Sequence, residues 1–221
     1  MEIRTIVNSL VDLFFPMRCI HCNYVIDTTQ ILCVPCVTDL PYTHWNLDQK
    51  NKAFKQLYQY CRVEGAYSLL HFTKENCAQS ILHEMKYKSR PELGKLLAPK
   101  VLIDLSSYDG IIPVPLHPKR LKQRGYNQVE DFSKALAEIH QIPYLDNILI
   151  RRQFNSSQVF KKKQERIESM KDAFHLSHSD FKGNYIIIDD LITTGATLSQ
   201  AILPFNSLSN VNVSVVTIAC A

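Results

Sequence analysis

The segment best suited to chemistry is an apolar run that ends in two acids and a loop of small residues. It spans residues 185–197 and reads YIIIDDLITTGAT. At the expected start of a helix, the loop offers successive backbone N–H groups and threonine hydroxyls, which together suit an anion such as phosphate. The glycine lets the backbone approach a ligand closely, because it has no Cβ atom. We therefore predict a phosphate site at Thr193, Thr194, Gly195, Ala196 and Thr197.

Asp189 and Asp190 directly precede this loop and would repel the same phosphate. They need another task, either hydrogen-bonding sugar hydroxyls or holding hydrated Mg²⁺ on a diphosphate. A sugar phosphate accounts for both the acids and the loop. The alternative is a pair of acids at a strand end that caps the next helix.

Four of the seven cysteines form two close pairs near the N-terminus, Cys19 with Cys22 and Cys33 with Cys36. Each Cys-x-x-Cys turn places two thiolates on one side of a tight knuckle, and two such turns complete a tetrahedral zinc site. A site with four thiolates has no open position, so we expect structural Zn²⁺. The alternatives are incidental buried cysteines, or His21 as a substitute ligand.

The composition is that of a folded globular protein, with 46% hydrophobic and 21% charged residues, which excludes wholesale disorder. No stretch reaches the roughly 18 apolar residues that cross a bilayer, so we expect no membrane insertion and a cytoplasmic location. The first residues favour a short amphipathic helix that ends before Pro16.

The net charge of +4 is too small to indicate nucleic-acid binding by itself, but the basic residues cluster. One cluster lies at residues 117–124 and the other at residues 151–171, where seven basic residues face two acids. Such clusters are either solvated surface or anion-binding residues that flank the phosphate loop.

The elements that must position these residues follow a strand-then-helix pattern. We predict strands at 65–72, 110–116, 147–152, 173–176, 184–190 and 211–220, and helices at 76–87, 91–102, 129–140 and from about 196. Residues 46–52 are predicted to be a linker or the start of a connecting helix. Apolar runs such as YIII and VSVVTIA are continuous, as in strands buried on both faces of a parallel sheet. The fold class is therefore α/β with a doubly wound parallel sheet. The glycine-rich dinucleotide and P-loop motifs are absent.

These segments support a family resemblance. IIIDDLITTGAT closely resembles the phosphoribosyl pyrophosphate motif of type I phosphoribosyltransferases. Together with the two cysteine pairs, three further segments resemble the ComF family of competence proteins: PVPLHPKRLKQRGYNQ at 113–128, SQVFKKKQER at 157–166 and MKDAF at 170–174. The resemblance covers nearly the entire chain.

The resemblance implies a sheet of the type I phosphoribosyltransferase kind and three parts. These are a helix with zinc knuckles at 1–44, a connecting or hood region at 45–105 and the phosphoribosyltransferase-like domain at 106–221. The implied ligand is phosphoribosyl pyrophosphate or another ribose phosphate, bound with Mg²⁺.

By the same resemblance, Asp189 and Asp190 would contact the ribose hydroxyls. Arg120 and Arg124, or Gly125, would lie near the diphosphate. The basic run at 151–171 occupies the place of a mobile loop that closes over the substrate, with Gln158, Lys161 and Arg166 as diphosphate contacts. The alternative for this run is a solvated helix.

Two functions follow from these expectations. One is an enzyme that transfers phosphoribosyl to an acceptor the sequence does not identify, with no catalytic base assigned. The other is a non-catalytic accessory protein that handles single-stranded DNA during natural transformation. The resemblance then implies single-stranded DNA and a competence helicase as partners.

Overall fold

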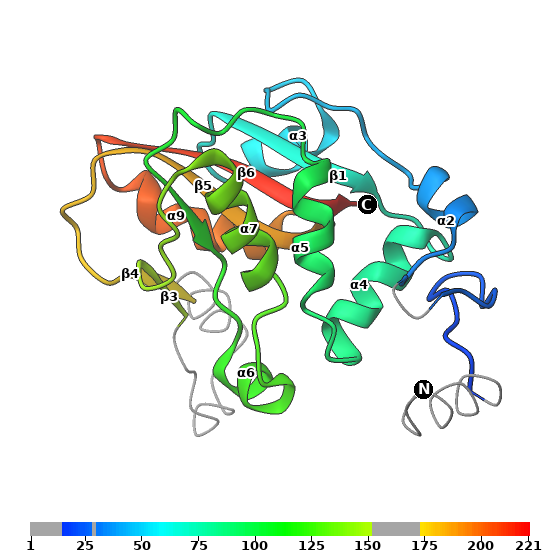
Figure 1. Cartoon of the computed structure of the whole chain (residues 1–221). Coiled ribbons are helices and arrows are strands. Elements are labelled where there is room, and N and C mark those ends of the chain that lie inside the picture. Colours follow the sequence, from blue (N-terminus) through cyan, green and yellow to red (C-terminus); the bar gives the residue numbers. More distant parts are fainter. Residues whose placement is uncertain (1–14, 28–29, 152–172) are drawn as a thin grey trace, which may run out of the picture.

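The computed structural model describes residues 15–27, 30–151 and 173–221 (Figure 1). Its centre is a four-stranded sheet with the strand order β1-β6-β5-β2, in which all neighbouring strands are parallel. The strands are β1 (Gly65–His71), β2 (Gly110–Pro113), β5 (Gly183–Ile192) and β6 (Val211–Cys220). This confirms the predicted α/β fold with a parallel sheet.

Both faces of the sheet are covered, and β5 shows why its apolar run is continuous. Ile186 and Ile188 point into one hydrophobic core, whereas Ile187 between them points into the other. Side chains alternate between the faces of a strand, so a strand with a core on each side is apolar at every position.

One face of the sheet packs against α4 (Cys77–Tyr87), α5 (Leu93–Leu97) and α7 (Glu130–His140). The opposite face packs against α3 (Lys52–Tyr58) and α9 (Ala196–Asn206). A further helix, α6 (Pro118–Arg124), follows β2 and has no buried residue. A short helix, α2 (Val34–Thr38), carries the last cysteine of the two pairs.

Two predicted strands lie outside the main sheet. β3 (Leu149–Arg151) and β4 (Phe174–Leu176) pair with each other as a separate antiparallel ribbon. In each strand only the first residue is buried, so neither has the two apolar faces that a strand of the central sheet requires. The prediction that these two strands continue the strand-then-helix pattern of the parallel sheet was therefore wrong.

The helix predicted at 91–102 is shorter, because α5 gives way to a 3₁₀ turn, η1 (Ala98–Lys100). Pro99 has no backbone N–H, so it cannot donate the hydrogen bond that would continue α5 as an α-helix. Residues 46–52 do lead into a helix, since Asn51 caps α3 by accepting from the backbone of Phe54.

The predicted N-terminal helix falls within residues 1–14 and so lies outside the described residues. Among the helices that the structure describes, none has both the length and the apolar character needed to cross a membrane.

Candidate functional site

The two predicted acids lie at the carboxyl end of β5, where parallel sheets of this class bind ligands. Asp189 and Asp190 are both buried, at 8% and 5% exposure. They line a cavity of about 230 Å³. Six of the predicted ligand residues share this cavity: Arg120, Arg124, Asp189, Asp190, Thr193 and Thr197.

The phosphate loop has the expected backbone. Gly195 is the N-cap residue of α9 and has a φ of +76°, a left-handed conformation that favours glycine. A Cβ atom there would lie 2.9 Å from the backbone oxygen of Gln56 in α3. The remaining loop residues, Thr194 and Ala196, line a neighbouring cavity of about 450 Å³ together with Thr197.

The segment RGYNQ folds as a turn whose residues reach three different elements. Gly125 ends α6 in a left-handed conformation with a φ of +86°. The Tyr126 hydroxyl donates to the backbone oxygen of Met85 in α4, at 2.5 Å. The Asn127 side chain donates to the backbone oxygen of Val114, just after β2, at 3.0 Å. These bonds fix the turn beside the cavity.

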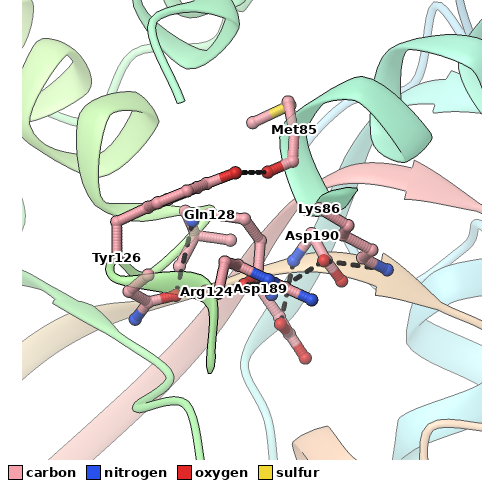
Figure 2. A network of polar contacts seen from close by, with 9 residues as sticks. Met85, Lys86, Arg124, Tyr126, Gln128, Asp189 and Asp190 are labelled. Atoms are coloured by element: carbon pink, nitrogen blue, oxygen red, sulfur yellow. Dashed lines mark hydrogen bonds and ion pairs between the residues drawn. The ribbon is translucent and has the colours of Figure 1, made fainter. Parts of the chain in front are cut away.

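Asp190 is held by two partners from other elements (Figure 2). Lys86, in the last turn of α4, forms an ion pair of 2.9 Å with its Oδ2. Gln128 donates from Nε2 to the same oxygen at 2.8 Å. The Oε1 of Gln128 accepts a hydrogen bond from Arg124, whose guanidinium also lies 5.7 Å from the centre of the Tyr87 ring.

Asp189 is in a different electrostatic environment from Asp190. Burial, together with the neighbouring charge of Asp190, raises the pKa of Asp189 from 3.8 to about 7. The backbone N–H of Asp190 donates to Asp189 Oδ1 at 2.9 Å, and the charges of Lys86 and Arg151 oppose the rise. Asp189 thus carries a carboxyl group that is costly to ionise in the free protein.

A second cavity, of about 380 Å³, shares Lys86, Tyr87, Arg120 and Arg124 with the first. Its lining contains three cations and no acid, namely Lys86, Arg120 and Arg124 with Tyr87, Ser89, Gln123 and Tyr126. On the other side of the acids, burial and the nearby Arg120 lower the pKa of Arg151. The surroundings of the two acids are therefore positively charged and suited to an anionic ligand.

Sequence reasoning did not single out four residues that line the acid cavity: Lys86, Tyr87, Gln128 and Arg151. Gln128 was visible as the last residue of RGYNQ, whereas Lys86 stands in an ordinary amphipathic helix with no local signal. Two predicted diphosphate contacts, Lys161 and Arg166, lie outside the described residues, as does Gln158.

The four predicted metal ligands come together. The Sγ atoms of Cys19, Cys22, Cys33 and Cys36 all lie within 4.8 Å of one another, and those of Cys22 and Cys33 are 3.5 Å apart. A tetrahedron of thiolates around zinc has sulfur–sulfur edges of about 3.8 Å, so the cluster fits Zn²⁺. His21 is not part of the cluster, since its Nδ1 lies 3.1 Å from Ser80 Oγ.

The surroundings of the thiols favour at least one thiolate. Burial alone would raise the pKa of Cys19, but backbone N–H groups of Cys22, Cys33 and His21 outweigh it and lower this pKa to about 6. By contrast, burial raises the pKa of Cys77, which lies in the same hydrophobic core, to about 12. The three remaining cysteines, Cys61, Cys77 and Cys220, are buried, as is common for small apolar side chains.

The chain is similar in sequence to proteins named for competence or for DNA utilization. Competence protein F of Haemophilus influenzae is 38% identical over 95 residues, which is 42% of each chain. Competence protein ComFC of Streptococcus pneumoniae is 30% identical over 131 residues, or 58% of this chain and 57% of that protein. DNA utilization protein YhgH of Escherichia coli O157:H7 is 26% identical over 196 residues, or 82% of this chain and 81% of that protein. The chain is thus similar to two proteins named for competence and to one named for DNA utilization.

The match to the ComF-family protein of H. influenzae spans less than half of that protein's length. No family model matches the chain. Among solved structures, glutamine phosphoribosylpyrophosphate amidotransferase from B. subtilis has 19% identity and a TM-score of 0.38, covering 57% of this chain and 25% of that one. UMP synthase of Leishmania donovani has 18% identity and a TM-score of 0.34, covering 75% and 30%.

Proposed function

We propose that this protein binds phosphoribosyl pyrophosphate, with the ribose 5-phosphate group in the 230 Å³ cavity at the end of β5. One observation carries the proposal: Asp189, Asp190, and two loop threonines, Thr193 and Thr197, line the same cavity as Arg120 and Arg124. Acids alone would repel a phosphate, and arginines alone would not select a sugar. Their combination suits a ligand with both hydroxyls and phosphates.

Each group has a task in this proposal. The N–H groups and hydroxyls of residues 193–197, at the N-terminus of the 11-residue helix α9, bind the 5-phosphate. Asp189 and Asp190 accept hydrogen bonds from the ribose hydroxyls. Arg120 and Arg124, which line both cavities, bind the diphosphate with their planar, multiple-donor guanidinium groups.

Mg²⁺ belongs to this proposal as a companion of the diphosphate. The residues present fit it, because carboxylate and phosphate oxygens are the ligands that Mg²⁺ prefers and Asp189 has no cationic side chain bonded to it among the described residues. Asp189, and through waters Asp190, would hold the ion. When bound, Mg²⁺ supplies charge neutralisation of the diphosphate.

A role in DNA uptake or use is also part of this proposal. Competence protein F and DNA utilization protein YhgH are named for these processes, and we extend that role to this chain as part of the proposal. Ligand binding without turnover would fit a regulatory task, whereas turnover would make the protein a phosphoribosyltransferase. Release of diphosphate from phosphoribosyl pyrophosphate distinguishes the two.

Isothermal titration of the full chain with phosphoribosyl pyrophosphate and with ribose 5-phosphate, each with Mg²⁺, tests the proposal. We expect both ligands to bind, and the double variant Asp189→Asn/Asp190→Asn to lose more than tenfold in affinity for each. Asp180→Asn, at an exposed position, is the matched control. If the unsubstituted protein binds neither ligand with Mg²⁺, the proposal is wrong.

A second function, handling of single-stranded DNA, is favoured by the cations and the exposed Tyr87 ring at the second cavity. Tyr87 is 68% exposed beside Lys86, Arg120 and Arg124. Salt-dependent binding of a single-stranded oligonucleotide is expected. The Asp189→Asn/Asp190→Asn variant should keep this binding if the DNA binds to a surface patch outside the acid cavity. If the unsubstituted protein binds no oligonucleotide at low salt, DNA handling is excluded.

A further inference from the structure

The side chain of Gln128 joins the two halves of the proposed site (Figure 2). It is 7% exposed, donates to Asp190 and accepts from Arg124. We propose that Gln128 is a positioning residue that aims Arg124 at the diphosphate of a ligand whose ribose is held by Asp190. This inference rests on the proposed function for the identity of the ligand, but the positioning itself can be tested without any ligand.

The amide of Gln128 has one possible orientation in this setting. Its NH₂ group faces a carboxylate, which only accepts, and its oxygen faces a guanidinium, which only donates. Turning the amide over would bring oxygen against oxygen and N–H against N–H, and would leave two buried groups unsatisfied. The orientation of Gln128 is thus set by Asp190 and in turn fixes where Arg124 must lie.

The two partners depend on Gln128 unequally. Asp190 has a second strong partner, since Lys86 forms an ion pair with the same carboxylate oxygen at 2.9 Å. Arg124 sits in the last turn of α6, a helix with no buried residue, and it also lies over the Tyr87 ring, itself 68% exposed. Removing the Gln128 amide should therefore leave Asp190 in place but release Arg124.

This asymmetry predicts how affinities change. Ribose 5-phosphate lacks the diphosphate, so its binding should fall by less than about threefold in Gln128→Met. Phosphoribosyl pyrophosphate should lose about tenfold to a hundredfold, the range expected for a lost charge-assisted hydrogen bond. Arg124→Met should produce a loss of similar size, because it removes the group that Gln128 positions.

A double-mutant cycle separates positioning from general destabilisation. The double variant Arg124→Met/Gln128→Met should bind phosphoribosyl pyrophosphate no more weakly than either single variant, because both act on one contact. Gln49→Met, at an exposed residue bonded to the backbone of Glu64 at the start of β1, is the matched control and should bind like the unsubstituted protein. Additive losses in the cycle would overturn the inference.

The ligand-free measurement is NMR of the Arg124 guanidinium. In the unsubstituted protein, restricted rotation should give separate Nη resonances, and Gln128→Met should average them. Unchanged Arg124 resonances in Gln128→Met would refute positioning even if the ligand binds. If positioning is seen but neither ligand binds, the proposed function fails while the inference about Gln128 stands.

Discussion

Replacing Asp189 by Asn should stabilise the free protein while weakening the binding of a ribose phosphate. Burial and the charge of Asp190 raise the pKa of the Asp189 carboxyl to about 7, against 3.8 for an ordinary aspartate. The folded state therefore holds more protons than the unfolded state between about pH 4 and pH 7, and its stability falls as the pH rises through that window. Asn is uncharged and avoids this loss.

The size of the effect follows from the pKa shift. A shift from 3.8 to about 7 corresponds to at most about 4 kcal/mol, at roughly 1.4 kcal/mol for each pKa unit. Rearrangement of the neighbouring charges should reduce this to about 1–3 kcal/mol, which is roughly 5 °C in melting temperature for a chain of this length. The side-chain oxygen of Asn can still accept the hydrogen bond from the backbone N–H of Asp190, so the substitution removes the charge and keeps this contact.

The assay is thermal and urea unfolding at pH 5 and at pH 8, with Asp190→Asn as the contrasting variant. Asp190 is paired with Lys86 and Gln128, so its neutralisation should destabilise the protein by about 1–3 kcal/mol at both pH values. Asp189→Asn should gain stability over the unsubstituted protein at pH 8 and little at pH 5. If Asp189→Asn is no more stable than the unsubstituted protein at pH 8, the argument that the buried Asp189 carboxylate destabilises the fold is refuted.

Three further perturbations test other parts of the structure. Removing zinc with a chelator should expose four thiols and make the segment around Cys19–Cys36 sensitive to protease, and unchanged proteolysis would contradict a structural metal site. Gly195→Ala should cost about 1–3 kcal/mol and weaken ribose 5-phosphate binding, because a Cβ atom would meet the backbone of Gln56; an unaltered melting temperature would contradict this. Tyr126→Phe should cost about 1 kcal/mol and speed amide exchange at the end of α4, since the bond to the Met85 carbonyl is lost; equal exchange rates would show that this bond contributes nothing.

Several features could be predicted because their signals are local. The continuous apolar runs of β5 and β6 indicated strands buried on both faces, and the two Cys-x-x-Cys turns indicated a closed metal cluster. The small residues of the loop indicated the start of a helix near residue 196, where α9 begins. The division into parts at 1–44, 45–105 and 106–221 stays a prediction, as do the proposed contacts of Lys161 and Arg166.

The errors arose where a short segment depends on its neighbours. β3 and β4 have strand-like sequences, but three-residue strands with one buried position each can pair away from the central sheet. The helix predicted at 91–102 changes to a 3₁₀ turn at residues 98–100, where Pro99 cannot donate the backbone hydrogen bond of an α-helix.

By itself, the sequence indicated the strands of the central sheet, the acid pair, the cluster of four cysteines and the loop that we propose as a phosphate site, because each is encoded within a few adjacent residues. Tertiary structure alone decided that Lys86, 104 residues before Asp190, would be its ion partner, and that Gln128 would join Asp190 to Arg124. It also decided that the two adjacent acids would differ: Asp190 gains an ion pair and an amide donor, whereas Asp189 is buried with neither among the described residues. Such pairings depend on how α4, the turn after α6 and the end of β5 pack together, and no spacing within one segment specifies that packing.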